Sequence, residues 1–284
     1  MSLGPCEIFE VGPRDGLQNE KREIPVAEKV ALVDKLSEAG FRRIECASFV
    51  SPKWVPQMAG SGEVLSGITR AEGVRYAALT PNMRGYEDAL AAKADEIAIF
   101  ASASDGFSQK NINASIDEAF ERFAPILEEA RHVDIPVRGY VSCVVECPYD
   151  GRVDPGDVAR VADKLFAMGC YEISLGDTIG AGTPDSIARM LLSVRDVVPA
   201  GRLAGHYHDT HGRAMANIDA SLSMGLRVFD AAVGGLGGCP YAPGAAGNVA
   251  TEAVNEHLTA LGYDTGVDQA VVLEAAEMAR AMRG

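Results

Sequence analysis

The chain lacks a long apolar run, an excess of basic residues and a regular cysteine pattern, and each absence excludes a class of protein. No apolar stretch approaches the roughly 20 residues that a transmembrane helix needs. The formal net charge of −14 repels phosphate backbones and disfavours nucleic-acid binding. The six cysteines show neither a disulfide framework nor zinc-finger spacing, which is typical of free thiols. The first residues carry no secretory signal, so we expect a cytoplasmic protein.

Short β-rich runs alternate with longer helical stretches along the whole chain. The strand candidates begin near Cys6, Arg42, Val74, Glu96, Pro136, Tyr171, Arg202 and Val228. Eight strand–helix units at intervals of about 30 residues match the arithmetic of a TIM barrel. Continuous apolar runs such as Ile97–Phe100 favour parallel strands that are buried on both faces. We therefore expect an α/β fold, a (β/α)8 TIM barrel that forms a single catalytic domain over residues 1–284.

Helix signals agree with this scheme. Apolar residues recur at helical spacing from Glu28 to Leu36, and a last helix from Asp268 to Met282 is expected to pack on the barrel. Thr183 and Pro184 open another helix as an N-cap and first-turn proline. Glycines follow the expected helix ends at Gly40, Gly169, Gly225 and Gly262. The competing fold is a doubly wound open sheet, but no Gly-x-Gly-x-x-Gly follows the first strand.

Polar residues gather where the predicted strands end, which is where the active site of such a barrel lies. They are Arg14, Asp15, Glu45, Tyr140, Asp177 and the segment His206–Asp209. Residues i and i+2 of a strand share a face, so His206 and His208 are expected to converge near the top of the barrel. A carboxylate such as Asp15 would complete a nitrogen and oxygen site that suits Mg²⁺ or Mn²⁺. Two hydrogen-bonded histidines without a metal are the alternative, which Arg14, Asp15 and Asn248 disfavour.

Two further features suit catalysis. Arg14 beside Asp15 can hold a carbonyl that becomes an enolate while Asp15 binds the metal, although a simple loop salt bridge is the alternative. The run Gly234–Gly247 has more glycine than a plain turn needs, and we expect a hinged lid there. Cys239 lies inside this run and would meet the reacting carbon on closure. An incidental thiol is the alternative, and its role as acid or base stays open.

Six segments of the chain resemble 3-hydroxy-3-methylglutaryl-CoA (HMG-CoA) lyases. They are Gly12–Lys21, Ser48–Gln57, Gly139–Cys143, Ser174–Gly180, His206–Thr210 and Gly235–Tyr241. The resemblance covers nearly the whole chain. These lyases belong to a metallolyase barrel superfamily that also includes isopropylmalate, homocitrate and citramalate synthases. The Ser-Pro-Lys-Trp segment and the Gly-Gly-Cys-Pro loop resemble the lyase branch specifically.

The resemblance implies an activity and a set of roles. The implied reaction splits HMG-CoA into acetoacetate and acetyl-CoA, as in leucine breakdown and ketone-body chemistry, and the implied assembly is a homodimer. The implied metal ligands are Asp15, His206, His208 and Asn248. The implied catalytic residues are Arg14, Cys239, Asp15 and His206, and the implied substrate-binding residues are Arg14, Gln18, Glu45, Tyr140 and Asp177. Against these relatives we expect no mitochondrial extension of the eukaryotic kind, and hence a bacterial-type cytoplasmic enzyme. No cysteine follows Cys239 in the sequence, so redox control by a C-terminal thiol is not expected.

Several alternatives stay open at this point. Asp15, His206 or a relayed group is the base. A Claisen-type synthase of the same superfamily, a lyase for a larger 3-hydroxyacyl-CoA and a catalytically silent scaffold are competing functions. The candidate phosphate contacts for coenzyme A are Lys21, Arg22, Lys53 and Lys110, each of which is also an ordinary surface charge.

Overall fold

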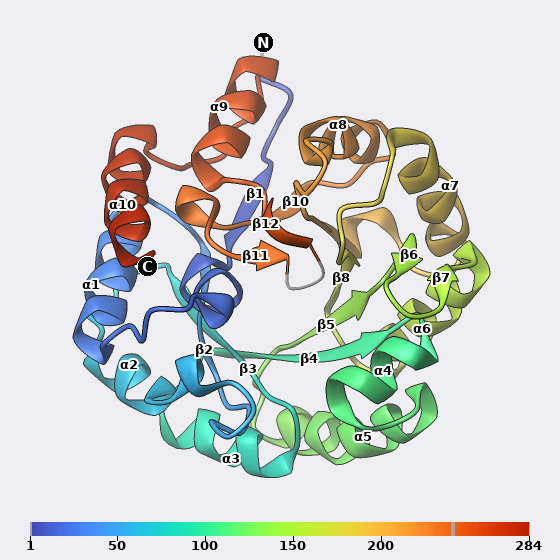
Figure 1. Cartoon of the computed structure of the whole chain (residues 1–284), viewed down its shortest axis with the longest axis horizontal. Helices are drawn as coiled ribbons and strands as arrows, with labels where there is room; N and C mark the ends of the chain where they lie inside the picture. The colour runs from blue at the N-terminus through green and yellow to red at the C-terminus, as the bar shows by residue number, and fades with distance from the viewer. Residues whose placement is uncertain (1, 240–241, 284) are drawn as a thin grey trace.

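Eight parallel strands close into a barrel in the computed structural model, which describes residues 2–239 and 242–283, with 238–239 and 242–246 described by their backbone alone (Figure 1). Their order is β1-β10-β9-β8-β5-β4-β3-β2. The strands are β1 Glu7–Glu10, β2 Arg43–Ser48, β3 Arg75–Leu79, β4 Glu96–Ser102, β5 Val137–Ser142, β8 Glu172–Asp177, β9 Leu203–Tyr207 and β10 Val228–Ala231. Each strand begins within one residue of its predicted start. The expected (β/α)8 barrel is confirmed.

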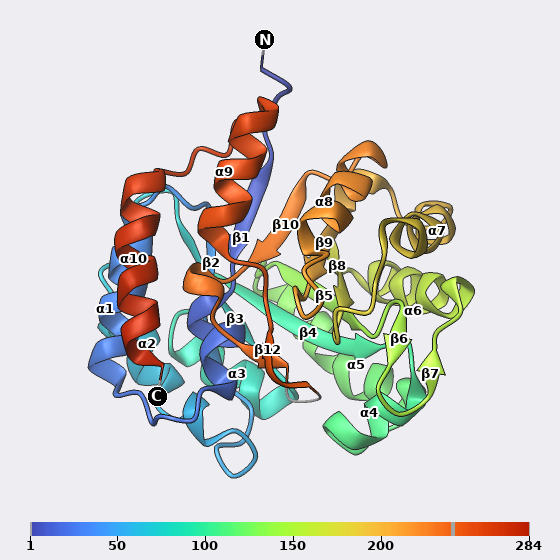
Figure 2. The ribbon, with the colours of Figure 1, turned by 45° about the horizontal axis from the view of Figure 1, so that its top comes forward.

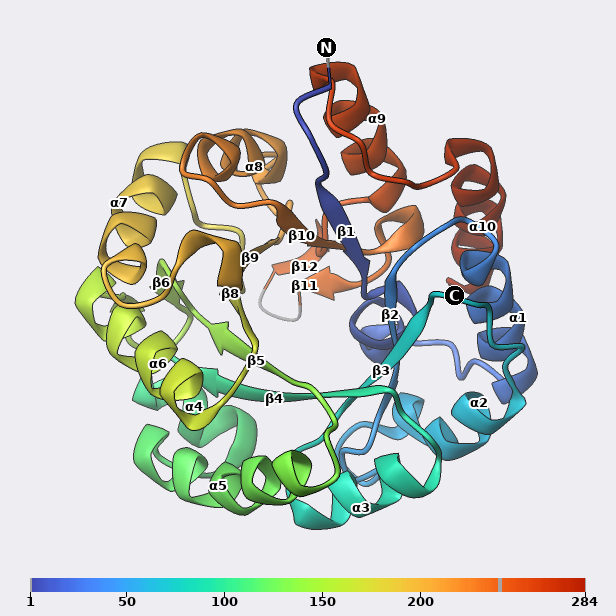
Figure 3. The ribbon, with the colours of Figure 1, turned by 180° about the vertical axis from the view of Figure 1, so that it is seen from behind.

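Helices surround the strands, as the views from the front and from behind both show (Figures 1 and 3). They are α1 Val26–Ser37, α2 Ser61–Gly67, α3 Met83–Ala91, α4 Asp105–Ile112, α5 Ile116–His132, α6 Pro155–Met168, α7 Pro184–Arg195, α8 Ala214–Ser223, α9 Thr251–Leu261 and α10 Gln269–Met282. The C-terminal helix α10 lies beside α9 and packs against α1 (Figure 2). Among the described residues, no helix combines the length and apolar character needed to cross a bilayer.

The predicted helix boundaries have identifiable physical causes. Thr183 caps α7 by accepting from the Ser186 backbone N–H, and the Ser186 hydroxyl accepts from the Thr183 backbone N–H in return. Gly169 and Gly262 end α6 and α9 in the left-handed region, with φ of 112° and 95°. Asp268 accepts from two backbone N–H groups at the start of α10. Local capping chemistry therefore stops and starts these helices where the sequence predicts.

Irregular segments extend the barrel at the carboxyl ends of its strands. After β1 the chain forms a π-helix turn, η1 Gly12–Gly16, and a 3₁₀ turn, η2 Leu17–Asn19. Short hairpins follow β5 and β10, namely β6 Glu146–Cys147 with β7 Gly151–Arg152, and β11 Gly238–Cys239 with β12 Ala242–Ala246. The remaining 3₁₀ turns are η3 Pro56–Met58, η4 Ala200–Arg202 and η5 Val233–Gly235. Except for η4, which lies between α7 and the start of β9, these segments follow strand ends, so they build the face where a barrel holds its active site.

The interior of the barrel contains charged side chains in place of uniform apolar layers. The fully or nearly fully buried charges there are Arg43, Glu96, Arg138, Glu172 and Asp230. Apolar packing lies mainly between the strands and the surrounding helices. The five cysteines with described side chains are free and buried, in agreement with the expectation of free thiols.

Candidate metal and active site

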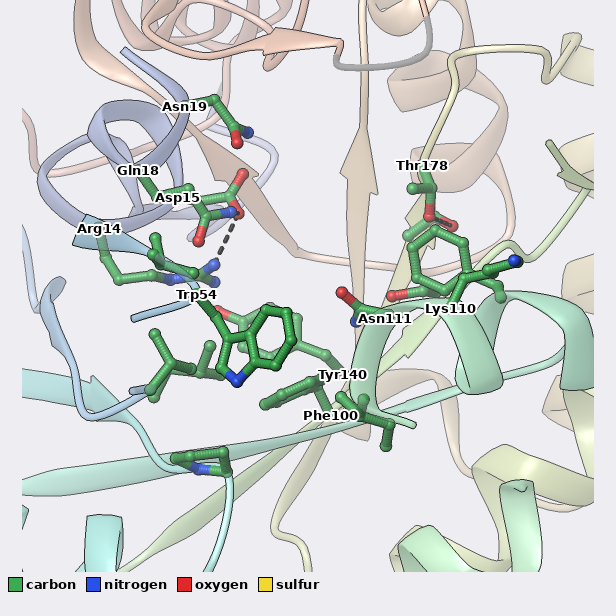
Figure 4. A pocket seen from close by; sticks show the side chains of 18 of the residues that line it. Arg14, Asp15, Gln18, Asn19, Trp54, Phe100, Lys110, Asn111, Tyr140 and Thr178 are labelled. Atoms are coloured by element: carbon green, nitrogen blue, oxygen red, sulfur yellow. Dashed lines mark hydrogen bonds and ion pairs between the residues drawn. The ribbon is translucent and has the colours of Figure 1, made fainter. Parts of the chain in front are cut away.

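A cavity of about 620 Å³ opens at the carboxyl ends of the strands. Seven of the predicted site residues line it: Arg14, Asp15, Gln18, Tyr140, His206, His208 and Asn248. Figure 4 shows Arg14, Asp15 and Gln18 on one side of the cavity, across from Lys110 and Asn111 of α4. Segments far apart in the sequence therefore bring their polar groups to one place.

Three of these residues form the one cluster of metal-ligating His, Cys, Asp or Glu groups found among the described residues. The ligand atoms of Asp15, His206 and His208 all lie within 4.8 Å of one another. Nε2 of His206 is 3.8 Å from Oδ2 of Asp15, and the two imidazole centroids are 5.4 Å apart. Two imidazoles and a carboxylate suit a divalent cation of the Mg²⁺ or Mn²⁺ type. The predicted convergence of the two histidines is present.

The protonation of Asp15 and His208 favours a cation, whereas burial of His206 is outweighed by the neighbouring carboxylates of Asp230 and Asp15, which raise the pKa of His206. Burial opposes the shift, but Arg14, the two histidines and a hydrogen bond from Asn248 lower the pKa of Asp15 to about 2. Burial, helped by His206, lowers the pKa of His208 to about 4. The buried Nδ1 of His208 has no hydrogen-bond partner among the described residues. A neutral imidazole beside a carboxylate leaves lone pairs that a metal can use, so the donor set fits a divalent ion.

Asn248 lies beside the three residues without joining them through its oxygen. Its Nδ2 donates to Oδ2 of Asp15 at 2.8 Å, and its backbone bridges that of His208. Asn248 is 4% exposed. As a fourth ligand it would have to turn its carbonyl oxygen toward the cluster, so that role stays a prediction.

Arg14 is buried and held by two carboxylates. Its Nε donates to Glu45 at 2.5 Å and its Nη1 to Asp15 at 2.6 Å. The guanidinium lies over the Tyr140 ring, 5.5 Å from its centroid. Nη2 makes no hydrogen bond to the described residues, so these N–H groups are the donors left for a ligand. The backbone N–H groups of residues 14–16 all bond to the Val11 carbonyl, and this π-turn sets the position of Arg14 and Asp15.

The other predicted site residues lie at different distances from the chemistry. Gln18 donates to Asp15 at 2.9 Å and lines the cavity. The Tyr140 ring packs edge-on against His206, and burial raises the pKa of its hydroxyl. Asp177 does not line the cavity. Its carboxylate accepts from the Gly182 N–H at 2.8 Å, and burial raises its pKa to about 6.

The structure describes the predicted lid only in part, and it places one of the four predicted phosphate contacts at the cavity. The side chain of Cys239 lies outside the described residues, although Gly237, two residues earlier, lines the cavity. Lys110 lines the cavity, but Lys21, Arg22 and Lys53 do not. Arg22 pairs with Glu28 instead, at 2.6 Å.

Residues beneath the cavity escaped the sequence analysis. Asp230 and Arg138 form a fully buried ion pair directly below His206. Glu10 accepts from the Gly12 and Val233 N–H groups and from Thr251, and so ties η1 to η5. The available signal was a charged residue inside an otherwise apolar strand, as in Phe229-Asp230-Ala231. A buried charge needs a partner, and that rule marks these positions.

Comparisons with known proteins agree with the geometry. The HMGL-like family model matches residues 6–279. A Pseudomonas aeruginosa protein named 3-hydroxy-3-isohexenylglutaryl-CoA/hydroxy-methylglutaryl-CoA lyase is 58% identical over 277 residues, which are 98% of this chain and 92% of the relative. The hydroxymethylglutaryl-CoA lyase of Pseudomonas mevalonii is 56% identical over 94% of this chain and 89% of its own. The crystal structure of the HMG-CoA lyase from Brucella melitensis superposes with a TM-score of 0.98 at 59% identity and covers 99% of both chains.

Proposed function

Because this chain belongs to the HMGL-like family and is a carbon–carbon lyase, we propose that it cleaves HMG-CoA into acetoacetate and acetyl-CoA with a bound divalent metal. The observation that carries the proposal is the contact of two groups in one cavity. The cluster of Asp15, His206 and His208 fits a cation, and the Arg14 guanidinium lies directly beside it. The proposed reaction places negative charge on two oxygens, that of the C3 hydroxyl and that of the thioester enolate. A cation and a fixed guanidinium stabilise such charges.

The cleaved bond joins the carbon next to the thioester to C3, which carries the hydroxyl. A base removes the hydroxyl proton, the oxygen electrons form the acetoacetate carbonyl, and the electrons of the broken C–C bond pass into a thioester enolate. Protonation of that enolate carbon gives acetyl-CoA. Asp15, His206 and His208, with Asn248 as the further proposed ligand, would hold Mg²⁺ or Mn²⁺, which would supply Lewis acidity that lowers the pKa of the hydroxyl.

The chain's own residues act on the charge that develops. Arg14 offers its remaining N–H groups to the enolate oxygen, and Glu45 and Asp15 hold the guanidinium in place. Gln18 orients the Asp15 carboxylate. The Tyr140 ring contacts the Arg14 guanidinium with its face and the His206 ring edge-on.

Three assignments stay open within this proposal. The base is Asp15, His206 or a relayed group. Cys239, in the hairpin of β11 and β12, is the residue proposed to meet the reacting carbon. Asp177 supports the site through the loop at Gly182.

A wider setting follows from the proposed reaction. We place the activity in leucine breakdown and ketone-body formation, in the cytoplasm, with a homodimer as the assembly. Light scattering on the purified protein measures the assembly, and a mass of one 30.0 kDa chain would contradict the dimer.

A second candidate substrate is a 3-hydroxyacyl-CoA with a longer C3 substituent. One wall of the cavity is apolar and formed by Val50, Leu79, Phe100 and Tyr140. The Pseudomonas aeruginosa relative carries a longer substrate, the isohexenyl compound, in its name. An apolar wall of this kind gains about 0.8 kcal/mol for each additional methylene that it buries.

A product assay separates these functions. The purified protein is incubated with HMG-CoA and Mg²⁺, and acetoacetate and acetyl-CoA are quantified by mass spectrometry. Equal release of both products supports the lyase, and parallel reactions with C3-extended acyl-CoAs rank the substrates by kcat/KM. Condensation of acetyl-CoA with a 2-oxo acid, in the absence of cleavage, would identify a synthase. No product in either direction would indicate a silent scaffold.

A further inference from the structure

A second carboxylate lies behind the candidate metal ligand His206. Oδ2 of Asp230 is 3.0 Å from Nδ1 of His206, on the side of the ring that faces away from the metal cluster. The two residues are register partners on the neighbouring parallel strands β10 and β9, so both side chains point into the barrel. A carboxylate only accepts hydrogen bonds, so it keeps the ring proton on Nδ1. The lone pair of Nε2 is then left facing Asp15.

Asp230 is itself fixed from below. Arg138, which is 0% exposed, donates to its two oxygens at 2.7 and 3.0 Å, and Ser174 donates to Oδ2 at 2.7 Å. Oδ2 therefore has contacts with Arg138, Ser174 and His206. The oxygen that accepts from Nη1 of Arg138 is thus the same one that faces Nδ1 of His206.

The network continues toward the amino end of the barrel. Nε of Arg138 donates to Glu172 at 2.7 Å, and Glu172 pairs with Arg43 at 3.0 Å. Residues 138 and 172 are register partners on β5 and β8, which places both inside the barrel. Buried ion pairs of this kind are weak contributors to stability, because their desolvation offsets their attraction. Their presence under a metal ligand calls for a role in the site.

His208 provides an internal comparison. Its buried Nδ1 has no hydrogen-bond partner among the described residues, so no described carboxylate holds that nitrogen as Asp230 holds Nδ1 of His206. The two imidazoles lie 5.4 Å apart by their centroids, and only His206 is tied to the rigid barrel interior. The geometry of the pair depends on the His206 anchor.

We infer that Asp230 is a positioning residue for the metal centre, which fixes the tautomer and ring direction of His206, and that Arg138 holds Asp230 in that place. The inference rests on the proposed function, since His206 is a metal ligand only within it. Carboxylates behind metal-bound histidines typically change metal affinity by about 10–100-fold.

The test compares two amide variants of the same network. Asp230→Asn keeps the shape but replaces the acceptor-only group against Nδ1. Glu172→Gln is the matched control, because it removes a buried charge that touches Arg138 but not His206. Calorimetric titration with Mn²⁺ is expected to show about 10–100-fold weaker binding for Asp230→Asn. For Glu172→Gln we expect wild-type Mn²⁺ affinity and a lower thermal midpoint. Equal loss in the two variants would reduce Asp230 to general support of the barrel and overturn the inference.

A second readout needs no metal. Long-range ¹H–¹⁵N correlation, at a pH where the His206 ring is neutral, reports which ring nitrogen carries the proton. The wild type is expected to show Nδ1–H, and Asp230→Asn a shift toward Nε2–H. If Asp230→Asn does not fold, Arg138→Lys replaces it, because lysine keeps the charge but loses the two-point grip on Asp230. Weaker Mn²⁺ binding by Arg138→Lys would support the inference, and unchanged binding would overturn it.

The outcomes separate the inference from the function on which it rests. A wild-type protein that binds no Mn²⁺ would refute the proposed metal, while the tautomer measurement would still decide whether Asp230 sets His206. Wild-type Mn²⁺ binding and HMG-CoA cleavage, with unchanged affinity in Asp230→Asn, would refute the inference alone.

Discussion

Replacement of Arg14 by lysine keeps the positive charge of the site and removes its planar fork. In the structure Nε and Nη1 of Arg14 bind Glu45 and Asp15, and Nη2 remains for a ligand. A lysine ammonium has three donors, and two of them would be needed to satisfy the same carboxylates. Only one donor would then face the substrate, from a group that is more strongly hydrated than a guanidinium.

The expected loss can be estimated from the number of donors removed. Loss of one donor to a developing oxyanion costs about 100-fold or more in turnover, or about 2.7 kcal/mol. The contact strengthens as the enolate forms, so the loss should fall on kcat more than on KM.

Steady-state kinetics on folded, metal-loaded protein measures this effect. Arg160→Lys is the control, because Arg160 is exposed on α6 and, among the described residues, pairs only with Asp157. We expect wild-type kinetics for Arg160→Lys and a fall of about 100-fold or more in kcat for Arg14→Lys. Unchanged turnover with only a raised KM would mean that Arg14 anchors substrate, and the enolate role would have to move elsewhere.

Three further predictions address the ligands, the hairpin and the pH dependence. His208→Ala should weaken Mn²⁺ binding while Tyr207→Phe should not, because the Tyr207 hydroxyl bonds to Ser221 on α8; equal losses by calorimetry would contradict the assigned faces. Cys239→Ala should leave fold and metal affinity unchanged but lower kcat strongly, and wild-type kcat would make it a bystander. Burial raises the pKa of Glu10 to about 7, so the folded state holds a proton that the unfolded state releases near its ordinary pKa, and the stability from this group is lost as pH rises through 7. The free energy of unfolding, measured with urea, should therefore fall between pH 5 and pH 8 by about 2–3 kcal/mol less in Glu10→Gln than in wild type. An equal fall in the two proteins would contradict the assignment.

The barrel was predictable because its signals are local. Every strand start was placed within one residue, since each strand is bounded by turns and helix ends that a short stretch of sequence encodes. Thr183 and Gly169 are examples in which a single side chain or a left-handed residue fixes a helix end. The shared face of His206 and His208 followed from the two-residue period of a strand in the same way.

The interior network was not predictable because its pairs are distant in sequence. Arg138 and Asp230 are 92 residues apart and meet only when β5 and β10 close around the same axis. Asp177 shows a second limit. Its position at a strand end was correctly predicted, but its carboxylate turns to the Gly182 N–H in the following loop. The side that a side chain takes at a strand end depends on loop geometry, which the pattern of the strand does not contain.

Removal and return of the metal, followed by HMG-CoA cleavage, tests the central claim most directly. The protein is stripped with a chelator, its metal content is measured by mass spectrometry, and acetyl-CoA release is followed before and after Mg²⁺ or Mn²⁺ is added. The cluster of Asp15, His206 and His208 predicts no release from stripped protein and full recovery with about one equivalent of bound metal. Full turnover by protein shown to be metal-free would contradict the account.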